Sequence, residues 1–247
     1  DDMLLYLVRY YTREAGVRQL ERTIAAIARK TVLAILKDGK ESITLDKDLI
    51  HEWLGNEKTD YGKREEQDQV GTVTGLAYTS FGGDVLQIEA TKFEGKGNLV
   101  LTGQLGDVMK ESASIALDYL RSHAKEFGIG PECFGKLDIH VHVPEGAVPK
   151  DGPSAGVTMT TALVSCLSER PVKSNLAMTG EVTLRGNVLP IGGLKEKSLA
   201  AHRAGIDTIL IPKGNVKDLE DVPQEVKDHI RFVPVATAQE VLKEALV

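Results

Sequence analysis

A serine in a loop rich in glycine and proline is the residue of this sequence whose surroundings best suit a chemical reaction. The segment PKDGPSAG covers 149–156 and leads into an apolar run that predicts a helix over 154–167. Ser154 would lie at a helix amino terminus, where unpaired amides and the positive end of the helix dipole stabilise an anion. This placement suits a nucleophile with an amide-bound oxyanion, although an ordinary helix N-cap explains the loop alone at least as well.

Two other uses of this loop are open. The letters GPSAG fit the G-x-S-x-G elbow of α/β-hydrolases, but that elbow is a tight turn, and Pro149 and Pro153 lengthen the approach here. The later His202 and His229 have no obvious place on a hydrolase sheet. A phosphate cradle would use the same amides, but the sequence contains no GxxxxGK[ST] pattern.

Two lysines follow a Gly-Gly turn in the segment GEVTLRGNVLPIGGLKEK, which covers 180–197. On a helical wheel Lys197 falls on the apolar side with Leu194, whereas Lys195 lies on the polar side. Burial lowers the pKa of a lysine amine and leaves part of it neutral, able to take a proton from a serine hydroxyl. The alternative is a lysine whose ammonium reaches water over an apolar stem, and the pairing with Ser154 favours a Ser-Lys dyad.

Three further polar residues are close to these motifs in sequence. Thr179 ends a predicted strand and is placed to hydrogen-bond the lysine amine, while an acidic group such as Asp151 or Glu181 is placed to tune its charge. The alternatives are a hydrogen bond at a strand end and solvated loop carboxylates.

A strand with the letters LDIHVHV places His140 and His142 on one face. A triad of Ser154, His142 and Asp151 is conceivable, as is an HxH metal site. The metal site lacks a third ligand at a useful spacing, and the triad leaves the inward Lys197 unexplained. We therefore expect no metal, and we expect the histidines to support the structure or the substrate beside the active cleft.

The elements that position these residues divide the chain in two. Residues 1–55 predict a small, mostly helical unit with a long helix over 17–36, a brief strand over 43–45 and a short helix capped by Asp46. The polar stretch over 56–69 predicts a linker. Residues 70–247 predict a mixed α+β or α/β domain. Its strands are expected at 70–78, 85–93, 99–102, 136–143, 176–178, 182–184, 188–191 and 208–211, and its helices at 107–127, 154–167, 193–204 and 238–246.

Composition excludes several classes of protein. The chain has 247 residues, of which 42% are hydrophobic and 27% charged, and this is ordinary globular composition. A net charge of -6 argues against a surface devoted to nucleic acid, although a local basic patch stays open at Arg13, Arg18, Arg22, Arg29 and Lys30. Cys133, expected in a loop, and Cys166, expected in a helix, predict reduced thiols. No apolar run predicts a signal peptide or a membrane span, and the abrupt opening suggests a fragment of a soluble protein.

The two motif segments resemble the Lon protease family of Ser-Lys peptidases. PKDGPSAG and MTGEVTLRGNVLPIGGLKEKSLAAHRAG look like the two signature segments of that family, and the separation of 43 positions from Ser154 to Lys197 matches the family's dyad. The segment YTREAGVR near the start resembles the small α-subdomain of the family's AAA+ module. The resemblance implies a serine endopeptidase with Ser154 as nucleophile and Lys197 as general base, and it implies Asp151 and Thr179 close around them.

The resemblance also implies properties of a longer enzyme. Arg18 looks like the family's sensor-2 arginine, which reaches nucleotide phosphates, whereas the Walker motifs are missing from this chain. We expect no cofactor here, ATP and Mg in the full-length enzyme, a homo-hexamer, and unfolded, damaged or regulatory proteins as substrates. We expect weak peptidase activity without ATPase activity, and the bacterial cytoplasm rather than the mitochondrial matrix. The alternative is a non-proteolytic Lon-like binding or assembly module next to DNA, but weak DNA binding by the helical unit rests on scattered basic residues.

Overall fold

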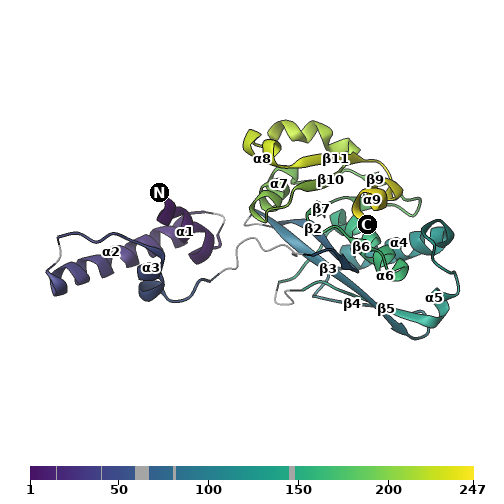
Figure 1. Cartoon of the computed structure of the whole chain (residues 1–247), viewed down its shortest axis with the longest axis horizontal. Helices are drawn as coiled ribbons and strands as arrows, with labels where there is room; N and C mark the ends of the chain where they lie inside the picture. Colours follow the sequence, from purple (N-terminus) through teal and green to yellow (C-terminus); the bar gives the residue numbers. More distant parts are fainter. Residues whose placement is uncertain (15, 40, 59–66, 80–81, 145–147) are drawn as a thin grey trace. The chain divides into compact units, whose positions relative to one another are not determined.

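The computed structural model describes residues 1–14, 16–39, 41–58, 67–79, 82–144 and 148–247. The protein divides into two compact units, Asp1–Lys63 and Arg64–Val247 (Figure 1). Much of the predicted linker over 56–69 lies outside the described residues, so the linker and the domain limits 1–55 and 70–247 stay predictions.

The smaller unit is built from helices that meet in a small apolar core. Its described helices are α1 (Asp2–Tyr11), α2 (Arg18–Asp38) and α3 (Lys47–Leu54). The long helix predicted over 17–36 is confirmed as α2. The buried side chains of this core come from all three helices and are Tyr6, Leu7, Tyr11, Ile27 and Ile50.

The short strand predicted over 43–45 is wrong. These residues pair with no strand in the described part of the chain, because the unit around them offers helices and no sheet edge. They lead instead into α3, where the predicted cap is present: the carboxylate of Asp46 accepts a hydrogen bond from the amide of Leu49 at 2.8 Å.

Among the described residues, a mixed seven-stranded sheet forms the centre of the larger unit. Its strand order is β11-β10-β7-β2-β3-β5-β4. Neighbours pair antiparallel from β2 through β3 to β5, and all other neighbouring pairs are parallel. The predicted mixed class is therefore confirmed. The strands are β2 (Thr72–Thr79), β3 (Gly82–Glu94), β4 (Leu99–Thr102), β5 (Leu137–His142), β7 (Leu176–Met178), β10 (Thr208–Pro212) and β11 (Arg231–Val235).

Two short antiparallel pairs lie outside this sheet. One joins β1 (Gln69–Val70) to β6 (Pro171–Val172), and the other joins β8 (Glu181–Val182) to β9 (Val188–Leu189). The strands predicted over 182–184 and 188–191 are therefore shorter than expected. Only two residues of each strand pair before the chain turns back.

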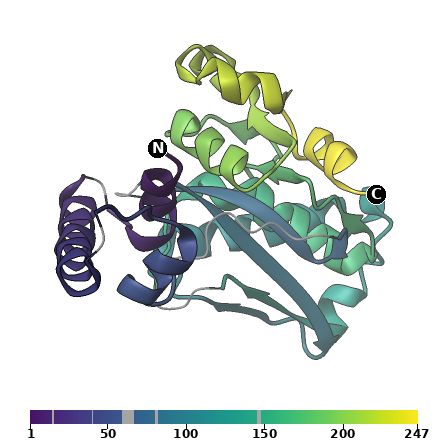
Figure 2. The same cartoon turned by 60° about the vertical axis from the view of Figure 1, so that its left-hand side comes forward.

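Helices cover both faces of the sheet (Figures 1 and 2). The alternation along β10 shows this division: Leu210 joins the core formed with α4, α6 and α9, whereas Ile209 and Ile211 join the core formed with α7 and α8. The helical segments are α4 (Asp107–His123), η1 (Ala124–Phe127), α5 (Cys133–Lys136), η2 (Pro153–Ala155), α6 (Gly156–Ser168), α7 (Leu194–Arg203), η3 (Lys213–Asp221), α8 (Gln224–His229) and α9 (Ala238–Ala245).

Helix α6 is the central helix of the larger core. Every residue from Gly156 to Cys166 is buried, so the helix is enclosed on all sides. Thr160 and Thr161 donate to the carbonyls one turn before them at 2.9 and 2.8 Å, whereas the hydroxyl of Thr158 is buried without a hydrogen-bond partner among the described residues. The first turn of this rigid helix follows directly on Ser154. Cys133, predicted in a loop, begins the short helix α5, and both cysteines are free thiols.

The small core of the first unit makes its stability easy to test. Ile50 is fully buried, and replacement by alanine is expected to destabilise this unit by about 2–5 kcal/mol. Trp53, the single tryptophan of the chain, lies in α3 and reports on this unit alone. We expect Ile50→Ala to lower the urea midpoint seen by tryptophan fluorescence. The unfolding transition of the larger unit, followed by circular dichroism, is expected to keep its midpoint. Leu36→Ala, at an exposed position, is the control, and a shift of both transitions together would contradict two independent units.

Candidate active site

Lys197 lies in the first turn of α7, on the side that the helical wheel predicts. It is 2% exposed, whereas Lys195 two residues earlier is exposed. Gly193 precedes the helix at φ 71°, a left-handed conformation that glycine adopts without strain and that turns the chain into α7. The two candidate bases therefore lie on different faces of α7, and Lys197 is the one that faces the core.

Burial changes the proton affinity of this amine. Desolvation lowers the pKa of Lys197 from 10.5 to about 8, because the charged form loses its hydration. The amine donates a hydrogen bond to Thr179 Oγ1 at 3.0 Å, which is the contact predicted for Thr179. Burial is the cause of the lowered pKa, and the tuning of this charge by Asp151 or Glu181 stays a prediction.

Ser154 lies in η2, a single 3₁₀ turn that precedes α6. The helix predicted from residue 154 begins in this tighter form, and Ser154 is half-buried. Its carbonyl oxygen accepts a hydrogen bond from the amide of Gly180 at 2.9 Å, and the amide of Val157 donates to the carbonyl of Gly180 at 3.0 Å. These reciprocal bonds fix the start of α6 to the segment that follows β7.

Thr179 connects the two candidate catalytic residues. Its hydroxyl accepts from Lys197 Nζ and donates to the carbonyl oxygen of Ser154 at 3.4 Å. Thr179 is fully buried at the end of β7, so its hydroxyl has a fixed position. Ser154 and Lys197, 43 residues apart in sequence, are thus brought to the same hydroxyl. In the described part of the chain no hydrogen bond joins their side chains directly.

Small residues make this close packing possible. A Cβ atom on Gly156 would lie 2.8 Å from the amide nitrogen of Val182, and one on Gly180 would lie 2.8 Å from Cγ1 of Val188. Gly156 therefore allows two backbone segments to approach each other beside the serine, and Gly180 leaves room for the side chain of Val188. The small residues near Ser154 are therefore explained by the lack of room for side chains as well as by exposure of the hydroxyl.

The amides near Ser154 are only partly available to an oxyanion. The amides of Gly156 and Val157 already donate to the carbonyls of Pro153 and Gly180. Among the described residues, the amide of Ser154 donates to no backbone carbonyl outside the 3₁₀ turn. An oxyanion at this helix start would be bound by this amide and its neighbours in the turn.

Asp151 anchors the loop that carries Ser154. Its Oδ1 accepts hydrogen bonds from the amide of Met109 at 3.0 Å and from that of Gly152 at 2.9 Å. Met109 is in the first turn of α4, so Asp151 caps a helix that has no capping side chain of its own. Gly106 leaves room for this carboxylate, since a Cβ there would lie 2.3 Å from its carbon.

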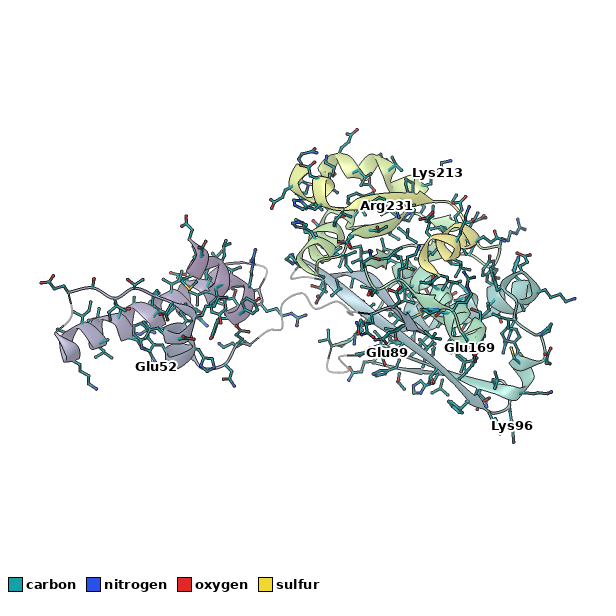
Figure 3. The ribbon with its side chains drawn as sticks, in the orientation of Figure 1. Glu52, Glu89, Lys96, Glu169, Lys213 and Arg231 are labelled. Atoms are coloured by element: carbon teal, nitrogen blue, oxygen red, sulfur yellow. The ribbon has the colours of Figure 1, made fainter. Side chains whose placement is uncertain are left out.

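The remaining predicted site residues lie in other contacts. His142 Nδ1 and His140 Nε2 both meet Thr102 Oγ1, at 2.7 and 2.8 Å, on the face of β5 predicted to carry them. Opposite His142 in the sheet is Glu89, an exposed residue of β3 (Figure 3). Among the described residues no group of three His, Cys, Asp or Glu side chains is placed to hold a metal.

Glu181 is half-buried in β8, and Arg18 is exposed at the start of α2 in the smaller unit. Glu181 makes no hydrogen bond to Lys197 within the described residues. The role expected of Arg18 stays a prediction.

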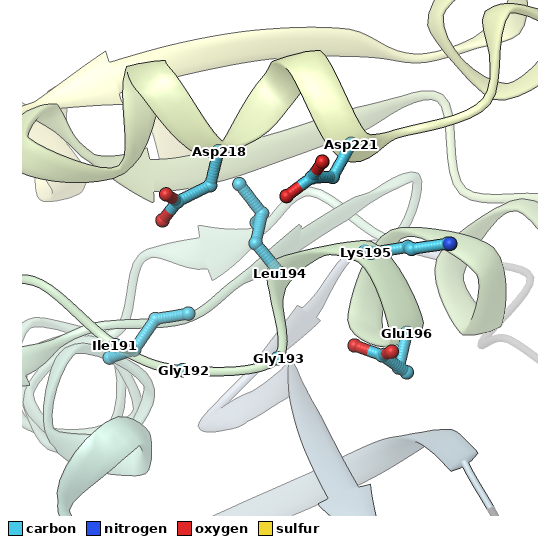
Figure 4. Close-up of a pocket in the computed structure, with 8 residues that line it drawn as sticks. All are labelled: Ile191, Gly192, Gly193, Leu194, Lys195, Glu196, Asp218 and Asp221. Atoms are coloured by element: carbon cyan, nitrogen blue, oxygen red, sulfur yellow. The ribbon is translucent and has the colours of Figure 1, made fainter.

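A pocket opens on the other side of the start of α7 (Figure 4). Lys195 and Glu196 line it from the helix, and Asp218 and Asp221 line it from η3. The turn before α7 is held by the buried amide of Asn215, which accepts from the amide of Ile191 at 2.9 Å and donates to its carbonyl at 2.8 Å. This pocket contains the polar lysine and not the buried one.

Comparison with known proteins shows the family of this chain. Residues 44–247 match the Lon protease (S16) C-terminal proteolytic domain, and residues 1–43 match the Lon protease AAA+ ATPase lid domain. The chain belongs to the Lon protease family. It is 57% identical over its whole length to Lon protease 1 of Syntrophobacter fumaroxidans and 56% identical over its whole length to Lon protease 1 of Bacillus subtilis. It is also 57% identical over 95% of its length to Lon protease of Mycoplasma mycoides.

The chain spans only 30–32% of the length of these Lon proteases. The matched Lon domains meet between residues 43 and 44, whereas the compact units meet between 63 and 64. The difference concerns α3, whose Ile50 is buried with Tyr6 and Ile27, so by packing this helix belongs with the lid. Within the described residues, no helix combines the length and apolar character that a membrane crossing requires.

Removing the buried charge is expected to stabilise the fold. Between pH 8 and 10.5 the unfolded chain holds more of the Lys197 proton than the folded chain, so stability rises with pH across this window. Below pH 8, the lowered pKa reduces the free energy of unfolding by on the order of 3 kcal/mol. We expect Lys197→Met to unfold at higher urea than wild type at about pH 6.5, with the difference shrinking by about pH 9.5, as measured by circular dichroism. A pH-independent difference would contradict a buried titrating amine.

Substitution of Asp151 separates anchoring from charge tuning. Asp151→Ala is expected to cost about 1 kcal/mol of stability through loss of the α4 cap, whereas Asp151→Asn keeps an acceptor oxygen and loses less. Because burial sets the pKa of Lys197, neither variant is expected to move the acid limb of a pH–rate profile. Thermal unfolding and that profile measure the two effects, and an acid limb displaced in Asp151→Asn would restore Asp151 as a partner of the lysine.

Proposed function

We propose that this chain hydrolyses peptide bonds with Ser154 as nucleophile and Lys197 as general base. The observation that supports this most is a lysine amine buried to 2% exposure and hydrogen-bonded to a hydroxyl that also contacts Ser154. Membership of the Lon protease family and the match to its proteolytic domain support the same reaction. A non-proteolytic binding module would have no use for an amine kept partly neutral.

The amine must be neutral when it acts. At a pKa of about 8 a substantial fraction is free base in mildly alkaline solution, and its lone pair accepts the Ser154 proton while one N–H stays bonded to Thr179. Ser154 Oγ attacks the scissile carbonyl, and backbone amides near Ser154 hold the oxyanion. The lysine then protonates the leaving amine, and water repeats the sequence on the acyl-enzyme.

We further propose the properties of the longer protein that family membership supports. The relatives are about three times as long as this chain, and residues 1–43 match an ATPase lid. In the full-length protein we propose ATP-dependent degradation of unfolded or damaged proteins by a homo-hexamer in the bacterial cytoplasm, with ATP and Mg bound mainly by residues outside this chain. Arg18 is the residue here that we propose contacts the nucleotide phosphates. No observation on the described residues favours DNA binding.

Cleavage of a fluorogenic peptide tests the dyad. We expect Ser154→Ala and Lys197→Met each to lower kcat/KM by about 10³-fold or more, because nucleophile and base act as a unit. Lys195→Met, on the exposed side of the same helix, is the matched control and is expected to keep its activity. Activity that survives in Lys197→Met but not in Ser154→Ala would assign the base to another residue.

The pH dependence of the same reaction follows from the lowered pKa. Since the protonated lysine cannot accept a proton, kcat/KM is expected to fall about tenfold per pH unit below about 8 and to level off above it. Initial rates at low substrate concentration measure this limb. A rate that stays constant down to about pH 5 would contradict a lysine base.

A further inference from the structure

The amine of Lys197 is only as well placed as the helix that carries it. Helix α7 lies across strands β2 and β3, and its first turn meets the hairpin at Gly83. A Cβ atom on Gly83 would lie 1.9 Å from the carbonyl oxygen of Glu196 and 2.9 Å from the amide nitrogen of Lys197. The backbone of the base residue therefore rests on strand β3 at a position that has no room for a side chain.

The other parts of α7 meet the same rung of the hairpin. Gly83 pairs with Tyr78 in the β2–β3 register, and the ring of Tyr78 lies 3.1–3.3 Å from where a Cβ of Gly193, the N-cap of α7, would be. At the far end of the helix, Arg203 Nη2 donates to the carbonyl of Gly83 at 2.7 Å. The start and the end of α7 are both held on one cross-strand pair.

We propose that Gly83 is a positioning residue for Lys197, which sets the height of α7 above the sheet and thereby places the amine at Thr179. This inference rests on the proposed function of Lys197 and goes beyond the dyad, because Gly83 contacts neither Ser154 nor Thr179 by any hydrogen bond in the described residues. The obstacle to a side chain at Gly83 is the backbone of α7, which cannot rotate away as a flexible side chain would.

The size of the displacement is set by ordinary contact distances. The distance between an added Cβ and the Glu196 oxygen must increase from 1.9 Å to 3.4 Å, where normal contact begins. The first turn of α7 therefore has to rise by about 1.5 Å. A misplacement of about 1 Å in a catalytic group is enough to lower a rate about 100-fold. The φ of Gly83 is outside the left-handed range, so alanine adds bulk there without backbone strain.

The test compares Gly83→Ala with Gly135→Ala. Gly135 also has φ outside the left-handed range, but nothing lies within 4 Å of its added Cβ. We expect Gly83→Ala to lower kcat for a fluorogenic peptide about 10–100-fold with KM changed less than about twofold, and Gly135→Ala to match wild type. Equal kcat in Gly83→Ala and wild type would overturn the proposal.

A second readout does not depend on cleavage. In protein labelled with ¹³C at the lysine ε-carbon, the Lys197 resonance is assigned by its loss in Lys197→Met and titrated by NMR. As α7 rises, water reaches the amine, so we expect its pKa to increase from about 8 toward the ordinary 10.5 in Gly83→Ala and to stay unchanged in Gly135→Ala. An unchanged resonance and titration in Gly83→Ala would refute the positioning role even in a chain that cleaves nothing.

The two readouts distinguish failure of the inference from failure of the proposed function. Cleavage that persists in Lys197→Met refutes the dyad but leaves the NMR comparison valid. If Gly83→Ala does not fold, Arg203→Gln removes the hydrogen bond to Gly83 from an exposed position. It is then expected to lower kcat about 3–10-fold and to shift the Lys197 titration in the same direction, and no change in either would overturn the proposal.

Discussion

The burial of one amine is the constraint on which the candidate site depends. A protonated lysine in the core costs the fold on the order of 3 kcal/mol near neutral pH, and the same desolvation brings its pKa to about 8. Such a cost is tolerated only where the surrounding structure holds the residue in place. Here α7 rests on the β2–β3 hairpin at Gly83, and the buried hydroxyl of Thr179 satisfies the amine.

The serine is positioned by a different set of contacts. Its loop is tied to α4 through Asp151 and to the end of β7 through the paired bonds between Ser154, Gly180 and Val157. Helix α6, enclosed in the larger core, gives the loop a rigid base. The two residues therefore reach the site from separate elements, and Thr179 is the residue at which these elements meet. Family membership explains the motif letters, and these contacts explain what the letters do in the fold.

The sequence predicted the parts of this site that depend on local periodicity. The helical wheel identified Lys197 as inward, and alternation placed His140 and His142 on one face. The sequence did not predict β11. Pro234 argues against a strand in most positions, and it is tolerated here because β11 lies at the edge of the sheet. The roles of Asp151 and Gly83 depend on contacts with residues 42 and 113 positions away, which no local pattern contains.

The reactivity of Ser154 itself tests the role of Lys197 most directly. A peptidyl sulfonyl fluoride labels an activated serine in a single step, and mass spectrometry of the intact chain measures the labelling rate across pH. If Lys197 activates Ser154, the rate will rise with an apparent pKa of about 8 and will be lost in Lys197→Met. A labelling rate that does not change with pH, or that survives in Lys197→Met, would contradict the buried amine as the base.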